Sequence, residues 1–202
     1  PFLIMADLIT VQEYKNAEGL TGNKDDQRLA ILVPQVSDLA KKYCGTSFID
    51  YYSADKVEYF NINDPHTSTV ILSECPVVTI DEVAERTGYS DSYTALTTGN
   101  YEYYFDSTAD SIKRTSDSGR EKNFPVGVGA VKVTYNAGYS ETPKDLKLAL
   151  FDLVNYYLRD EHKERRSIAG ATLQNQGTSG LTSSTDFPDH IKRVLDLYRV
   201  II

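Results

Sequence analysis

One stretch, Val131–Leu158, constrains the fold most, because it combines a strand, a turn and a long amphipathic helix. Apolar and polar residues alternate over 131–135, which is typical of a half-buried strand. Gly138 then permits a left-handed or strained turn because it lacks a Cβ. Thr142 is a candidate N-cap, and Pro143 stands where a first-turn proline is tolerated. The apolar positions that follow have the spacing of a helix with one face in a core: Leu146, Ala149, Leu150, Leu153, Val154, Tyr157 and Leu158.

Two further helices are predicted near the start of the chain. Thr10 and Glu13 have the spacing of a capping box, which predicts a helix over residues 10–18. A second apolar stripe, ended by a glycine, predicts a helix over residues 25–44. Pro34 falls inside this stripe and should either kink the helix or break it, because a proline removes one intrahelical hydrogen bond.

The middle of the chain is rich in strand patterns separated by turn sequences. The predicted strands are residues 57–60, 69–72, 77–83, 101–105 and 112–114. Residues 106–129 are otherwise polar and rich in Gly and Ser, which indicates a functional or mobile segment. The sequence therefore predicts an α+β fold. It consists of a small α-helical bundle with a long central helix (143–160), a β-rich insertion (about 48–135) and a tethered C-terminal helical arm.

The end of the chain differs in character from the rest. Residues 167–186 are mostly Gly, Ser, Thr, Asn and Gln, which is typical of a flexible linker. The predicted division is a core over 1–166, this linker, and an arm over 187–202. The arm carries an apolar helical stripe made of Ile191, Val194, Leu195 and Tyr198. This helix either docks on another molecule or folds back on the chain's own core.

Composition and motifs exclude several classes of function. The net charge of −8 argues against a conventional nucleic-acid binder, which needs a basic face for the phosphates. No apolar run approaches the ~20 residues that cross a bilayer, and Cys44 and Cys75 are predicted to be free thiols. The fifteen tyrosines suit either strands or a protein interface. No hydrolase elbow, metalloprotease, phosphate-loop or EF-hand motif is present, so no catalytic residue, cofactor or metal ligand is predicted and the chain is interpreted as a non-enzyme.

Several motifs together resemble the head–tail connector (adaptor) family of tailed bacteriophages. The most specific is VTYNAGY followed, after a short gap, by PKDLKLA at the start of the long helix. The segments LITVQEY, DDQRL, KYCG and CPVVTIDEV are also similar to the family, and FPDHIKRVLDLYR resembles the C-terminal arm of some members. Pro34 and the large strand-rich middle depart from the family pattern. The turn and helix-start residues of the resemblance are Tyr135, Gly138, Tyr139, Pro143 and Leu146.

This resemblance implies a structural protein that is made in the bacterial host cytoplasm and located at the head–tail junction of the virion. It implies a dodecameric ring, formed alone or only on the portal protein, that extends the DNA channel and carries a head-closure (stopper) or tail-completion protein. Genomic DNA would pass without sequence-specific binding, which suits an acidic chain. The implied portal-docking residues are Phe187, Pro188, Ile191, Lys192, Arg193, Leu195, Leu197, Tyr198 and Arg199. The implied loop toward a neighbour or the next neck protein contains Lys113, Arg114, Arg120, Lys122 and Phe124.

Two other interpretations stay open at this point. The chain can be the head-closure protein of the same neck, although the long helix after the turn favours the adaptor. It can instead be a small hydrolase or carbohydrate-binding module, which predicts a deep pocket with convergent polar groups. The adaptor interpretation predicts a terminal helix that is poorly ordered without the portal, so a terminal helix packed on residues 146–158 would argue against it.

Overall fold

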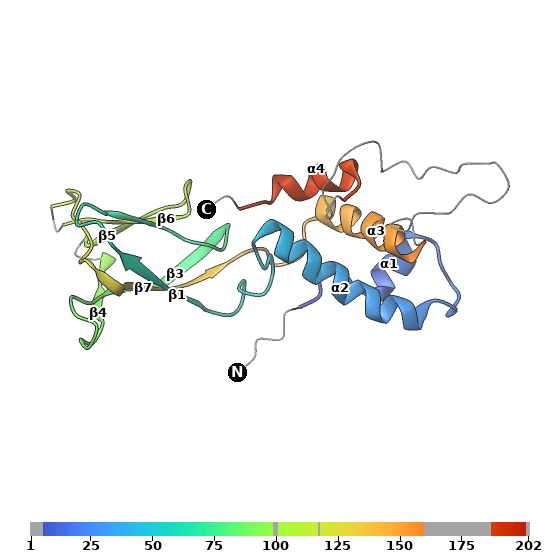
Figure 1. The fold of residues 1–202 in the computed structure, drawn as a ribbon, viewed down its shortest axis with the longest axis horizontal. Helices are drawn as coiled ribbons and strands as arrows, with labels where there is room; N and C mark the ends of the chain where they lie inside the picture. The colour runs from blue at the N-terminus through green and yellow to red at the C-terminus, as the bar shows by residue number, and fades with distance from the viewer. Residues whose placement is uncertain (1–5, 99–100, 117, 160–186, 201–202) are drawn as a thin grey trace. The chain divides into compact units, whose positions relative to one another are not determined.

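The computed structural model describes residues 6–98, 101–116, 118–159 and 187–200, and the chain divides into two compact units (Figure 1). Unit 1 is Pro1–Thr46 with Thr142–Ile202, and unit 2 is Ser47–Glu141. The described helices belong to unit 1 and the described strands to unit 2, which confirms the predicted α+β class. The predicted linker over 167–186 lies outside the described residues.

Helix α1 (Val11–Ala17) begins with the predicted capping box. Thr10 Oγ1 accepts a hydrogen bond from the backbone N–H of Glu13 at 3.1 Å, and Glu13 Oε2 accepts one from the backbone N–H of Thr10 at 2.8 Å. Two N–H groups that a helix start leaves unpaired are thus satisfied. The buried side chain of Tyr14 secures the helix through a hydrogen bond from its hydroxyl to Asn155 Oδ1 at 2.7 Å.

Helix α2 (Asp26–Cys44) is one continuous helix of 19 residues. It continues through Pro34, so the alternative of a broken helix is wrong. It ends at Gly45, which adopts the left-handed conformation with φ of 73°. The buried face of α2 contains Leu29, Val33, Val36, Ala40 and Cys44.

Helices α3 (Lys144–Leu158) and α4 (Asp189–Leu197) are the predicted central and terminal helices. The buried face of α3 consists of Leu146, Ala149, Leu150, Leu153 and Val154, as the spacing predicts. The last two residues of the predicted stripe, Tyr157 and Leu158, are only half-buried. The predicted N-cap at Thr142 is wrong, because Pro143 occupies the N-cap position. Thr142 Oγ1 donates instead to the backbone oxygen of Leu8 at 2.7 Å, which satisfies a hydroxyl that is buried.

Unit 2 is built from two antiparallel sheets with strand orders β1-β7-β3-β4 and β2-β6-β5. The strands are β1 (Lys56–Ile62), β2 (Thr69–Ile71), β3 (Val77–Glu85), β4 (Thr94–Leu96), β5 (Tyr103–Asp106), β6 (Ser111–Arg114) and β7 (Gly127–Ala137). The sequence predicts all of these except β4, although it predicts a much shorter β7.

Strand β7 is the centre of unit 2, because β1 and β3 pair with it on its two sides. Val131, Val133 and Tyr135 point into the core and are fully buried. They pack with residues of both sheets, including Ile62, Val70, Leu72, Val83, Ile112 and Phe124. Burying one such side chain contributes about 1.5–3 kcal/mol to the free energy of unfolding. Burial of apolar side chains in this shared core is therefore the main interaction that holds the two sheets together.

Candidate interaction surfaces

The terminal helix α4 packs against α2 and α3 of the same chain (Figure 1). Its anchors are Phe187, Ile191 and Leu195, which are 8%, 1% and 0% exposed. The ring of Phe187 meets the ring of Tyr43 edge-on, with 5.1 Å between the centroids. The expectation of a terminal helix that is poorly ordered without the portal is therefore wrong, and the alternative that the helix folds back on its own core is confirmed. This packing on α3 argues against the adaptor interpretation as far as that interpretation depends on a free arm.

Two tyrosine–aspartate pairs reinforce the packing of α4. Tyr43 Oη donates a hydrogen bond to Asp196 Oδ1 at 2.6 Å. Tyr198 Oη lies 2.7 and 2.8 Å from the two carboxylate oxygens of Asp145. The hydrogen bond to Asp196, together with burial, raises the pKa of Tyr43 to about 12. Both pairs join α4 or its C-cap to another helix, so these hydrogen bonds add to the apolar contacts that hold α4 in place.

Cys44 lies at the same contact. Its Sγ donates to the backbone oxygen of Leu195 at 3.4 Å, and its backbone oxygen accepts from the N–H of Val200 at 2.9 Å. Burial raises the pKa of the Cys44 thiol to about 12, so the thiol stays protonated and unreactive near neutral pH. Cys44 and Cys75 are both free, as predicted.

The opposite side of α4 faces solvent. Lys192, Arg193 and Leu197 are exposed, and we call these three residues the outer face of α4. Arg199 is also exposed, with its guanidinium carbon 5.7 Å from the centroid of the Tyr43 ring. Pro188 and Tyr198 are half-buried. The predicted docking residues thus divide into two sets. The inner set, Phe187, Ile191 and Leu195, holds α4 on its own unit, and the outer face of α4 is available to a partner.

The predicted turn after β7 depends on a close backbone approach. Gly138 has a φ of 99°, and a Cβ placed on it would lie 2.1 Å from the backbone oxygen of Phe48. The next residue, Tyr139, donates its N–H to the same oxygen at 2.7 Å. Only glycine fits this position, for both conformational and steric reasons. Tyr135 and Leu146, which flank the turn in the motif, are buried in their respective units.

The segment 106–129 contains β6, at the place of the predicted strand 112–114, and also the start of β7, which begins earlier than the sequence predicts. Arg114 is 3% exposed and makes a bidentate contact with the carboxylate of Glu85 at 2.9 and 3.0 Å. Its Nη1 also donates to the backbone oxygens of Glu102 and Thr115, at 2.6 and 2.7 Å. A side chain engaged in this way holds unit 2 together and is not available to a partner.

The other residues of the predicted loop have mixed positions. Phe124 is 2% exposed and belongs to the core. Lys113 Nζ pairs with Asp106 Oδ2 at 2.8 Å, across the β5–β6 pair. Arg120 and Lys122 are exposed and follow β6. These last two residues are therefore the strongest candidates for an external contact in this segment.

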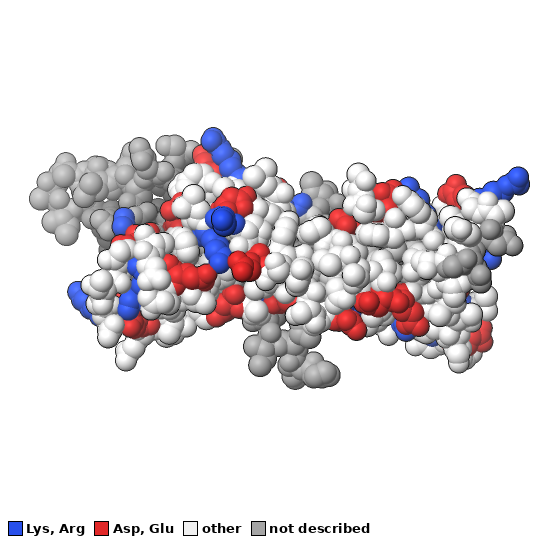
Figure 2. All heavy atoms as spheres, turned by 180° about the vertical axis from the view of Figure 1, so that it is seen from behind, with Lys and Arg blue, Asp and Glu red and all other residues white. Residues whose placement is uncertain are grey.

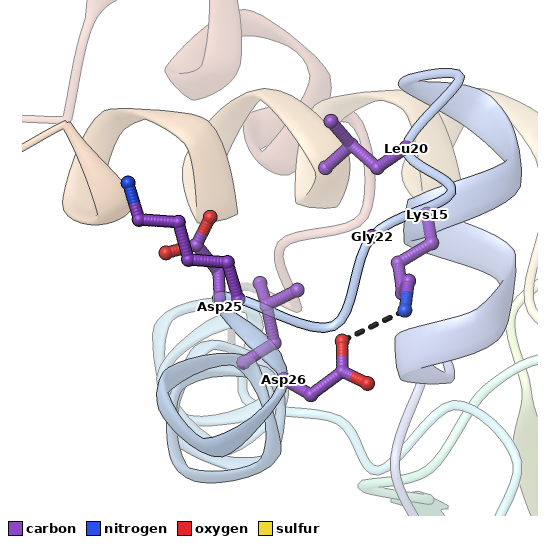
Figure 3. A pocket seen from close by; sticks show the side chains of 7 residues that line it. Lys15, Leu20, Gly22, Asp25 and Asp26 are labelled. Carbon is purple, nitrogen blue, oxygen red and sulfur yellow. Dashed lines mark hydrogen bonds and ion pairs between the residues drawn. The ribbon is translucent and has the colours of Figure 1, made fainter.

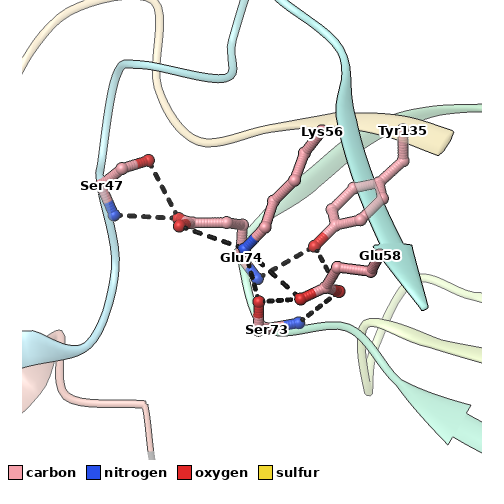
Figure 4. Close-up of polar contacts among 6 residues, drawn as sticks. All are labelled: Ser47, Lys56, Glu58, Ser73, Glu74 and Tyr135. Carbon is pink, nitrogen blue, oxygen red and sulfur yellow. Dashed lines mark hydrogen bonds and ion pairs between the residues drawn. The ribbon is translucent and has the colours of Figure 1, made fainter. Parts of the chain in front are cut away.

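A polar cluster inside unit 2 consists of Ser47, Lys56, Glu58, Ser73, Glu74 and Tyr135 (Figure 4). Tyr135 Oη donates to Glu58 Oε2 at 2.9 Å and accepts from the backbone N–H of Glu74 at 3.2 Å. Burial raises the pKa of Glu58, but hydrogen bonds from Ser73 and the charge of Lys56 outweigh it, so the pKa lies below its usual value. The groups of the cluster satisfy one another, which indicates a structural role.

An aromatic cluster that the sequence does not predict lies beside the β3–β7 pair. The Arg86 side chain donates to the backbone oxygens of Gly129 and Val128, each at 3.1 Å. Its guanidinium carbon lies 4.8 Å from the ring centroids of both Tyr89 and Tyr93. Tyr89 is 77% exposed. Because Arg and Tyr are enriched at protein interfaces, this cluster is a second candidate contact surface.

The net charge is divided unequally between the units. Unit 2 has 7 Lys and Arg against 15 Asp and Glu, which gives −8, whereas unit 1 has 14 of each and is neutral overall. Figure 2 shows Lys and Arg scattered rather than gathered in a continuous patch on the face that it draws. The net charge of unit 2 is therefore unfavourable for binding a phosphate backbone.

A small hollow in unit 1 lies between the end of α1 and the start of α2 (Figure 3). Its lining is Lys15, Leu20, Gly22, Lys24, Asp25, Asp26 and Leu29. Lys15 Nζ lies 2.7 Å from Asp26 Oδ1, so these two charges neutralise each other.

The described part of the chain contains no group of three or more His, Cys, Asp and Glu side chains that could hold a metal ion. No described helix is both long enough and apolar enough to span a membrane.

Comparison with known proteins identifies relatives that match nearly the whole chain. One protein-family model, described as head completion protein, matches residues 7–201. A head completion protein of Escherichia phage T5 is 25% identical over 194 residues, which cover 95% of this chain and 98% of that protein.

Two solved structures share the fold. A chain from the neck of an empty gene transfer agent particle, computed with C6 symmetry, has a TM-score of 0.58 and 16% identity, covering 96% of this chain and 91% of that one. A chain from the neck of a native particle, computed with C12 symmetry, has a TM-score of 0.54 and 15% identity, covering 98% and 96%.

Proposed function

The chain belongs to the head completion protein family, and on this premise we propose that it is a structural protein of a phage neck. The family comprises structural virion proteins, so the chain is not an enzyme, as the sequence predicts. The observation that carries the proposal is the family match over residues 7–201, which spans both units.

Within the neck, we propose the role of an adaptor that forms a dodecameric ring beneath the portal. The packing of α4 on α3 argues against a free docking arm, so this proposal assigns the portal contact to the exposed side of α4 alone. The ring extends the DNA channel and provides the platform for a head-closure or tail-completion protein. The fold shared with chains of necks computed with C6 and C12 symmetry supports this role. In a closed ring, each copy meets its two neighbours through two different surfaces. The aromatic cluster around Arg86 is available for such a contact.

The charge of unit 2 supports a place along the DNA path. A channel lining with a net charge of −8 per copy repels the phosphates, so DNA passes along it without being bound. A basic wall would bind the same DNA with an affinity that rises steeply as the salt concentration falls.

The outer face of α4 is the proposed contact with the portal. Lys192 and Arg193 supply positive charge and Leu197, 77% exposed, supplies apolar area, a combination that suits an acidic and partly apolar groove. The inner set of α4 residues keeps the helix ordered and so lowers the entropy cost of docking. Arg120 and Lys122 of unit 2 are the proposed contact with the next neck protein or the neighbouring copy.

The test is to measure the mass of the protein by light scattering, alone and with purified portal of the same phage. We expect a complex of one portal with a ring of the wild-type protein, and loss of this complex when Lys192→Glu, Arg193→Glu and Leu197→Ser are combined. The matched control reverses two exposed charges elsewhere in unit 1, Lys24→Glu and Lys42→Glu, and should keep binding. If the wild type does not bind the portal, the adaptor role is wrong. If the triple variant binds as well as the wild type, only the docking face is wrong.

A further inference from the structure

Helix α4 runs antiparallel to α3. His190, at the start of α4, has its Nε2 3.8 Å from Asp152 Oδ2, and Tyr198, just after α4, contacts Asp145 near the start of α3. From Asp152 to the end of α3 at Leu158 is about six residues, or ~9 Å of helix at 1.5 Å per residue. The start of α4 thus lies close to the end of α3.

The chain between the two helices is far longer than this geometry requires. Antiparallel helices that pack together are usually joined by about 2–8 residues. Here 27 residues, 160–186, separate Arg159 from Phe187. At about 3.3 Å per residue, such a length can span up to about 90 Å. The chain is therefore long enough to place α4 on the same surface of another copy.

The α4 helix also depends on the surface that it covers. It has only nine residues, and isolated helices shorter than about 12–15 residues are marginal in water. Its order therefore comes from the packing of Phe187, Ile191 and Leu195 and from the pairs of Tyr43 with Asp196 and of Tyr198 with Asp145. All of these contacts are the same whether the α2–α3 surface belongs to the same copy or to a neighbour. Exchange of an identical element between copies costs little for this reason.

We propose that in the assembled ring α4 of each copy packs on the α2–α3 surface of the next copy. This inference rests on the proposed ring. Each copy supplies one α4 helix and one α2–α3 surface. In a closed ring every α2–α3 surface is therefore covered and every α4 helix is packed. The outer face of α4 stays exposed after the exchange, and the neighbour's helices then present it to the portal.

The experiment uses cross-linking between two differently tagged chains, each with Cys75→Ser. One chain carries Asp152→Cys and the other His190→Cys; both positions are well exposed, with side chains 43% and 67% accessible. Cys44 is kept, because its protonated, buried thiol does not react near neutral pH. The two chains are mixed, assembled on portal, treated with a short bis-maleimide and separated on a denaturing gel.

Exchange predicts a covalent product that contains both tags, because only a contact between copies brings residue 152 of one chain to residue 190 of the other. A chain that carries both cysteines is the positive control for the reach of the reagent, and it should give ladders of two or more subunits. Each single variant assembled alone should give no product.

Cross-linked monomer alone from the double variant, with no two-tag product from the mixture, would overturn the exchange. Light scattering of the same samples separates the two proposals. Rings on the portal without the two-tag product leave the adaptor role intact and remove the exchange, whereas absence of rings removes both.

Discussion

The backbone oxygen of Phe48 lies 2.1 Å from the point that a Cβ on residue 138 would occupy. This oxygen accepts a hydrogen bond from the N–H of Tyr139, so it cannot move away without losing a partner. The turn after β7 is thus fixed by an approach of two backbone segments that are distant in sequence.

Replacing this glycine should destabilise unit 2 strongly. Gly138→Ala adds a steric overlap with Phe48 and places alanine at a φ of 99°, for a combined cost of about 2–4 kcal/mol. The loss should be visible as a lower urea midpoint. Gly22→Ala is the matched control, because a Cβ at that glycine meets nothing within 4 Å. Equal midpoints for the two variants would contradict the steric account.

Acidification should destabilise unit 2 through Glu58. Burial raises the pKa of this carboxyl, but Ser73 and Lys56 lower it below the ordinary 4.5. A carboxylate whose pKa is lowered by folding contributes stability above its unfolded pKa and loses that contribution as the pH falls through the folded pKa. The urea midpoint should therefore drop more steeply between about pH 5 and pH 3 for the wild type than for Glu58→Gln, which has no proton to gain.

The control for this pH series is Glu141→Gln, which removes an exposed carboxylate of the same unit. Its pH profile should follow that of the wild type. The role of Glu58 is refuted if Glu58→Gln has the same slope as the wild type.

Arg114 and Arg120 should respond very differently to substitution. Arg114→Met leaves the Glu85 carboxylate and two backbone oxygens without their donor, which should cost about 3–5 kcal/mol of unfolding free energy. Arg120→Met removes an exposed side chain and should change stability by less than about 0.5 kcal/mol. Chemical denaturation of both variants checks the contrast, and a small effect at Arg114 would show that the buried pair is dispensable.

Strongly alkaline solution should loosen α4. Asp196 and burial raise the pKa of Tyr43 to about 12. A group whose pKa is raised by folding contributes stability below its unfolded value of about 10, and this contribution is lost as the pH rises through the folded value. Tyr43→Phe should abolish this contribution at every pH and increase amide hydrogen exchange in α4 severalfold, with Tyr52→Phe as the exposed-tyrosine control. Unchanged exchange in α4 would mean that the apolar anchors alone hold the helix.

The parts of the fold that the sequence predicts well are those with local causes. The capping box of α1 is contained in four consecutive residues, and the apolar stripe of α3 is read from its own spacing. Strand β4 was missed because it has three residues, of which only Leu96 is buried, so it shows no alternation. It exists because its backbone pairs with the end of β3, which is a non-local cause.

The candidate surfaces are predicted less well than these parts of the fold, because they depend on contacts between residues that are distant in sequence. Arg114 ends a predicted strand, and an arginine there is expected to face solvent. Only its pairing with Glu85, 29 positions away, shows that its side chain is buried. The stripe on α4 predicts an amphipathic helix correctly, but a stripe does not identify the surface that covers it. The Arg86 cluster combines the residue after β3, the segment before β4 and the start of β7, so no single sequence window contains it.

The division of charge gives assembly a dependence on salt. Every copy that joins the proposed ring adds eight negative charges through unit 2 and no net charge through unit 1. Neighbouring copies of the proposed ring therefore repel one another through unit 2, and the contacts between copies must overcome this repulsion. At about 0.15 M salt, charges more than ~8 Å apart are largely screened, so rising ionic strength favours the ring. The salt concentration can thus determine whether this protein is a free subunit or part of the ring.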